Sequence, residues 1–119
     1  MKLTLSQLIT MRPSLVKLIE KDMPIKHAYN LARFIKKANA ELESFEETRV
    51  KLVNKYGEKD EAGNIAVSER NQQQFMNELS ELTEIEVEFE GFRTLKLADL
   101  RNITLTTQDM MGLVDIIEE

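Results

Sequence analysis

The sequence predicts one α+β domain over residues 1–119, mostly helical, with a long central helix, flanking antiparallel helices, a small antiparallel sheet and a C-terminal helix. Two patterns support this fold class. Between about residues 24 and 56, apolar residues recur at alternating spacings of three and four, as in a helix that buries one narrow seam. Between residues 84 and 90, apolar residues alternate with glutamates, which indicates a half-buried strand. The hydrophobic content of 42% and the charged content of 31% are typical of a folded globular protein.

The N-terminal region is expected to contain a strand followed by a helix. Residues 2–5 alternate between polar and apolar types, which predicts a short strand. Ser6 is the expected N-cap of the first helix. Pro13 lies within this helix and lacks an amide donor, so the helix is expected to kink or split near residues 11–12. Asp22 is the expected N-cap of the next helix.

The long central helix is expected to start near Pro24, which suits a first helical turn, and to end at Gly57. Only Arg49 interrupts its apolar seam. The Arg49 side chain either reaches water from a frayed helix end or forms a buried pair with Glu78 or Glu81 of the third helix. The seam residues are Ala28, Leu31, Ile35, Ala38, Leu42, Phe45, Leu52 and Tyr56.

A polar connector follows the long helix, with its turn at residues 63–64 and a brief extended piece at residues 65–67. A third helix should follow Ser68. Because a helix rises about 1.5 Å per residue, the first and third helices together match the length of the long one. Each is therefore expected to run antiparallel to it, one from either end. They would meet near residue 40, where the first strand could pair with the glutamate-rich strand.

The C-terminal third is expected to begin with that strand, over residues 85–89. Gly91 should turn the chain, so that residues 93–97 form the second strand of a hairpin. A C-terminal helix should follow, capped by Thr106 or Thr107.

Few residues suited to catalysis or transition-metal binding are present. The chain has no cysteine and one histidine, His27, which cannot supply the two or three ligands of a usual zinc site. No nucleophile elbow, phosphate-binding glycine loop or calcium-binding loop is recognisable. His27 is expected to be a surface or packing residue. The sequence therefore predicts a protein that is not an enzyme and needs no cofactor or metal.

Charge and hydropathy narrow the classes of partner. A net charge of −5 argues against binding to nucleic acid, because such binding depends on lysine and arginine that neutralise phosphates. No segment reaches the roughly 18 to 20 apolar residues that a membrane span requires. Neither nucleic acid nor membrane is therefore an expected partner.

Glu84, Glu86, Glu88 and Glu90 form the most distinctive charged feature. Side chains two apart on a strand share a face, about 6.5 to 7 Å apart along it, so four like charges there repel one another. One interpretation is an exposed strand whose charges prevent edge-to-edge pairing. The other is an acidic docking surface for a basic partner, which would make these four glutamates the partner-binding site.

Several segments resemble a family of small uncharacterised helical proteins encoded by phages and prophages of Gram-positive bacteria. They are the run from KLIEKDMPIKHAYNLARF to VNKYGEKDEAGN, then NELSELTEIEVEFE and LKLADL. The resemblance implies a phage origin and a non-enzymatic accessory role, and it supplies no catalytic residues.

These observations lead to the expectation of a phage-encoded, protein-binding accessory factor that acts on a host or phage protein in the host cytoplasm. The alternative is a virion component, such as a tail or neck accessory protein.

Phe34 lies outside the narrow seam of the long helix, about 60° from Leu31 at roughly 100° per residue. A helix that is apolar on more than one side needs more than one layer of cover. We therefore expect a homodimer whose two-fold contact includes Phe34.

Overall fold

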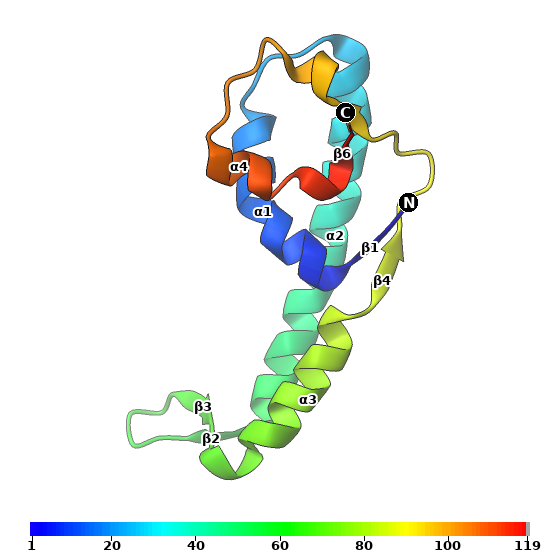
Figure 1. Cartoon of the computed structure of the whole chain (residues 1–119). Coiled ribbons are helices and arrows are strands. Elements are labelled where there is room, and N and C mark those ends of the chain that lie inside the picture. The colour runs from blue at the N-terminus through cyan, green and yellow to red at the C-terminus, as the bar shows by residue number, and fades with distance from the viewer. Residues whose placement is uncertain (119) are drawn as a thin grey trace.

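The computed structural model describes residues 1–118 and confirms a mostly helical α+β fold (Figure 1). The α-helices are α1 (Leu5–Ile19), α2 (Ile25–Tyr56), α3 (Gln72–Thr83) and α4 (Thr107–Met111). The strands are β1 (Lys2–Thr4), β2 (Gly57–Lys59), β3 (Ile65–Val67), β4 (Glu86–Glu88), β5 (Leu95–Lys96) and β6 (Ile117–Glu118). Short 3₁₀ turns are η1 (Glu69–Asn71), η2 (Leu97–Leu100) and η3 (Val114–Ile116).

Helix α2 has 32 residues and is the central helix of an elongated molecule of 53 × 28 × 20 Å. Helix α1 packs against its N-terminal half and α3 against its C-terminal half, each returning antiparallel to it (Figure 1). This is the arrangement that the element lengths predict. The C-terminal segments pack around α1 and the N-terminal half of α2, which makes this half of the molecule broad (Figure 1). The other half consists of α3 and the C-terminal half of α2, and we call it the arm.

The predicted mid-height sheet is confirmed. Strand β1 pairs antiparallel with β4, and Leu3 lies opposite Val87. Both side chains are buried, because they point from the sheet into the core. Backbone hydrogen bonds from Leu5 to Ile85 and from Phe89 to Met1 extend the pairing beyond both ends of the ladder.

Helix α1 corrects two expectations. Its N-cap is Thr4 instead of Ser6, and Thr4 forms a reciprocal capping box with Gln7. The helix is also continuous through Pro13, so the expected split at residues 11–12 is wrong. Pro13 lies on the exposed face, while the opposite face anchors the helix in the core through Leu8, Met11, Leu15 and Leu18.

The residues at the two termini of α2 determine where this helix begins and ends. Pro24 occupies the N-cap position, so the expectation of an Asp22 cap is wrong. Gly57 ends the helix as predicted, but its φ of −85° is not left-handed. Glycine is needed there for space, because a Cβ atom at this position would lie 2.3 Å from the carbonyl oxygen of Val53.

A small hairpin joins α2 to α3. Strands β2 and β3 pair antiparallel, so the extended piece predicted at residues 65–67 is part of a hairpin that was not predicted. In the turn, Asp60 Oδ1 accepts hydrogen bonds from the backbone amides of Ala62 and Asn64, each at 2.9 Å. Gly63 supplies the positive φ of 86°. Asp60 therefore stabilises a turn.

The predicted hairpin between residues 85–89 and 93–97 is wrong. Strand β5 pairs with β6, in parallel, and β4 pairs with β1. The C-terminal helix α4 is only five residues long, although Thr106 is its N-cap, as expected, and forms a capping box with Asp109. The chain continues beyond α4 through η3 and β6, and Leu113 and Ile116 fill the core.

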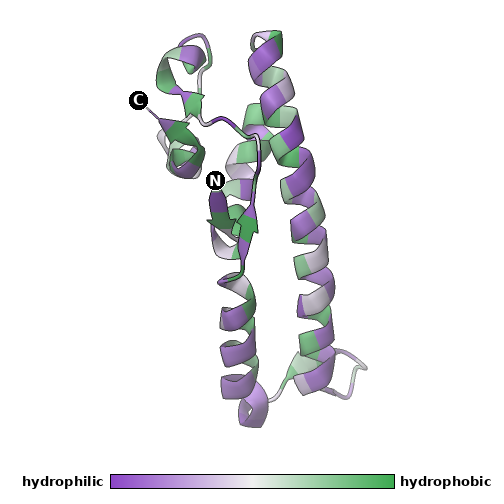
Figure 2. Cartoon of the chain, turned by 90° about the vertical axis from the view of Figure 1, so that its right-hand side faces the viewer, coloured by the Kyte–Doolittle hydropathy of each residue, from purple (hydrophilic) through white to green (hydrophobic). Residues whose placement is uncertain are grey.

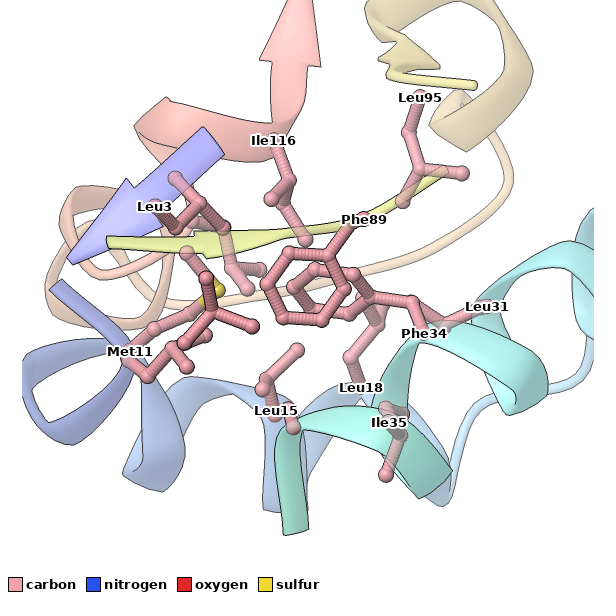
Figure 3. Close-up of a cluster of buried hydrophobic side chains, with 14 of the residues drawn as sticks. Leu3, Met11, Leu15, Leu18, Leu31, Phe34, Ile35, Phe89, Leu95 and Ile116 are labelled. Atoms are coloured by element: carbon pink, nitrogen blue, oxygen red, sulfur yellow. The ribbon is translucent and has the colours of Figure 1, made fainter. Parts of the chain in front are cut away.

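Phe34 lies inside the core, where its side chain is 2% exposed. Its ring centroid is 4.6 Å from that of Phe89 and 4.5 Å from that of Phe92. Figure 3 shows Phe34 and Phe89 surrounded by aliphatic side chains from α1, α2 and the C-terminal segments. The expectation that Phe34 faces a second copy is therefore wrong, because a distant part of the same chain covers it. The homodimer itself stays a prediction.

The arm has a much thinner core. No residue of α3 is fully buried, and Met76 is 48% exposed. Ile85, the first residue of the strand predicted over residues 85–89, precedes β4 and is 51% exposed. Figure 2 shows that hydrophilic residues cover much of the arm. Arg49 is partly exposed and hydrogen-bonds to Glu46 on the same helix, with Nε 2.9 Å from Oε2. Its side chain therefore lies at the surface and not in a buried pair with α3, but the expected fraying is wrong, because α2 continues to Tyr56.

Candidate functional site

The four predicted glutamates occupy different local structures. Glu86 and Glu88 lie on β4, whereas Glu84 is the C-cap of α3 and Glu90 comes just before the turn at Gly91. We call these four residues the acidic segment. The strand is shorter than expected, so the four carboxylates do not form one straight row, although they follow one another along the same stretch of chain.

Glu88 is already paired within the chain. The Met1 ammonium donates a hydrogen bond to Glu88 Oε1 at 2.8 Å. This hydrogen bond, together with the positive charges of Met1, Lys2 and Lys37, lowers the pKa of the Glu88 carboxyl. Lys37 also donates a hydrogen bond to the backbone carbonyl of Glu88, which fastens β4 to α2. The structure therefore assigns Glu88 a role in holding the sheet.

The remaining members of the acidic segment are available to a partner. Glu84, Glu86 and Glu90 are exposed, and none of them forms a salt bridge with the part of the chain that the structure describes. Their backbone is held in place by the capped end of α3 and by the β1–β4 pairing. Fixed, unpaired carboxylates of this kind can attract a basic surface.

A second charged feature was not anticipated. A groove runs between the N-terminal half of α2 and the segment that leads from β4 to β5. Its main cavity has a volume of about 790 Å³, and a neighbouring cavity of about 190 Å³ shares four lining residues with it. The basic residues along the groove are Lys26, Arg33, Lys37, Arg93 and Lys96. We call it the basic groove.

One side chain joins the two walls of the basic groove. The Asn30 side chain on α2 donates to the backbone carbonyl of Arg93 at 2.8 Å and accepts from the Arg93 amide at 3.3 Å. Phe92, the residue before Arg93, packs on buried Phe34. Gly91, with a positive φ of 74°, lies in the turn that follows β4.

Only the α2 wall of the basic groove could have been found from the sequence. Positions 26, 29, 30, 33 and 37 recur at helical spacing and therefore share one face, which carries Lys26, Tyr29, Asn30, Arg33 and Lys37. The other wall comes more than fifty residues later, and no local pattern links the two.

His27 is half-buried and lines this groove, which agrees with the expectation of a surface or packing residue. Its Nε2 atom lies 3.7 Å from Asp99 Oδ1, a contact that becomes an ion pair when the imidazole is protonated. Within residues 1–118, no group of histidine, aspartate or glutamate side chains is arranged to hold a metal ion. No helix in the same range is long and apolar enough to cross a membrane.

Comparison with models of known protein families, with curated proteins and with solved structures finds no significant match for this chain.

Proposed function

We propose that this protein is a phage-encoded, non-enzymatic accessory factor that binds a host or phage protein in the infected cell. The sequence resemblance supports the phage origin. The proposed binding surface is the acidic segment, with Glu84, Glu86 and Glu90 as the contact residues.

One observation carries this proposal. Three exposed carboxylates lie close together in the chain without basic partners among residues 1–118, whereas Glu88 between them is paired with Met1. Like charges held near one another repel, which destabilises the free protein. A partner with lysine or arginine residues at matching positions would relieve that repulsion and would associate faster because of charge steering.

The test is capture of partners from infected cells with the purified protein and with a charge-reversed variant. Glu84→Lys with Glu86→Lys changes the segment without touching the Met1–Glu88 pair. Glu43→Lys with Glu47→Lys is the matched control, because these residues are also exposed, form no salt bridge within residues 1–118 and lie on the arm. We expect the first variant to lose a partner that the parent and the control both retain.

Salt provides a second readout. Capture should weaken at high ionic strength, because exposed charges are screened beyond about 8 Å at physiological salt. Capture that survives both charge reversal and high salt would assign the acidic segment to solubility. Recovery of the protein in stoichiometric amounts from purified phage particles would favour a virion component over a regulatory factor.

A further inference from the structure

The basic groove has the dimensions of a peptide-binding site. From Lys26 to Lys37 the α2 wall advances eleven residues, which is about 16 Å at 1.5 Å per residue. An extended chain covers that distance with about five residues. The cavity volume of about 790 Å³ is within the range of ligand pockets, roughly 300 to 1,000 Å³.

The charges along the basic groove favour an anionic ligand. It carries five of the sixteen lysines and arginines of a chain whose net charge is −5. Lys26, Arg33, Arg93 and Lys96 form no salt bridge with residues 1–118. The acidic side chains that line it are Glu90, Asp99 and Glu118, and Asp99 faces His27.

The groove also offers apolar contacts. Tyr29 is 66% exposed, and the Arg33 guanidinium lies 6.0 Å from the centre of its ring. Phe92 is half-buried and stacks on Phe34, so its free surface forms an apolar patch between the two walls. Arginine recognises carboxylates through paired hydrogen bonds, and the aromatic surfaces accommodate apolar side chains.

We propose that the basic groove binds an extended acidic peptide in which carboxylate and apolar side chains alternate. This inference extends the proposed function, because such a peptide is a segment of a partner protein, but it uses a neighbouring surface that shares Glu90 with the acidic segment. A nucleic acid fits less well. Glu90 lines the smaller cavity and Glu118 the larger one, and each would repel a continuous phosphate backbone. A peptide can place its uncharged residues at those points.

The test measures fluorescence anisotropy with a labelled nonapeptide that alternates glutamate and leucine. We expect it to bind the purified protein, and a matched peptide with glutamine in place of glutamate to bind at least about tenfold more weakly. Arg33→Glu with Arg93→Glu should weaken binding of the acidic peptide by at least about tenfold. Lys36→Glu with Lys59→Glu is the matched control, because both lysines are exposed and lie outside the groove.

Circular dichroism establishes that each variant is folded, and Arg33→Gln with Arg93→Gln replaces the charge reversal if that variant unfolds. Equal binding to the parent and both arginine variants, or no binding to the parent, would overturn the proposal. Tighter binding of an oligothymidylate than of the peptide would overturn it in favour of nucleic acid. This assay uses purified protein and a defined peptide, so its outcome is independent of partner capture through the acidic segment.

Discussion

Replacement of Phe34 by alanine should be among the most destabilising single changes in this chain. Phe34 is 2% exposed and contacts the rings of Phe89 and Phe92 at centroid distances of 4.6 and 4.5 Å. Its removal would leave a cavity where α2, β4 and the following segment meet. The change therefore weakens the contact between the central helix and the chain that covers it.

The magnitude follows from the burial. Truncation of a buried phenylalanine to alanine costs about 3 to 5 kcal/mol. Unfolding entropy is about 2.1 cal/mol/K per residue, so for 119 residues a loss of about 4 kcal/mol lowers the melting temperature by roughly 16 °C. Phe75→Ala on the arm should have less than about half that effect, because Phe75 is only half-buried.

Urea unfolding followed by circular dichroism gives the free energies of both variants. A loss below about 1 kcal/mol for Phe34→Ala would refute the assignment of Phe34 to the core. Phe34→Glu distinguishes a core role from an interface role. A core residue predicts an unfolded or severely destabilised protein, whereas an interface residue predicts a folded protein of reduced mass in light scattering.

Three further predictions concern single positions. Gly112→Ala should destabilise the protein by about 1 to 3 kcal/mol in urea unfolding, because a Cβ atom there would lie 2.1 Å from Oγ of buried Ser14; an unchanged midpoint would refute the close contact. Pro13→Ala should raise the melting temperature, since the helix is continuous at this exposed position and proline disfavours a helix interior by about 3 kcal/mol relative to alanine; a lower melting temperature would contradict this. The lowered pKa of the Glu88 carboxyl predicts a stabilising contribution that is present above its ordinary pKa and is lost as the pH falls through the lowered value. The free energy of unfolding of Glu88→Gln should therefore fall less steeply than that of the parent as the pH is lowered into the acidic range. The same pH dependence in both proteins would count against the Met1–Glu88 pair.

The sequence predicts the helices and the mid-height sheet well because both follow from local periodicity and length. The spacing of Leu31, Ile35, Ala38 and Leu42 defines the buried face of α2, and all four are buried. Helical periodicity shows which face of a helix is apolar but not which distant segment covers it. The interpretation of Phe34 was wrong for this reason, since Phe89 and Phe92 cover it from the other end of the sequence.

The C-terminal third was harder to predict because its elements are very short. Strands β5 and β6 have two residues each, too few to show an alternating pattern. The basic groove is a similar case. Its two walls come from residues 26–37 and 90–96, and they are brought together by the packing of Phe92 on Phe34 and by the hydrogen bonds between Asn30 and Arg93.

The β1–β4 pairing affects the order in which the chain completes its fold during synthesis. The α1–α2 and α2–α3 pairs join neighbouring segments, so each can form soon after it emerges from the ribosome. Met1 and Glu88, by contrast, are 87 positions apart. Leu113 and Ile116 are fully buried in the same core as the apolar face of α1, and they are translated long after it. At about 5 to 20 residues per second, the part of the α1 face that α2 does not cover would therefore stay exposed for roughly 5 to 20 seconds. A chain that stopped before Leu113 would have its helical pairs but an open core.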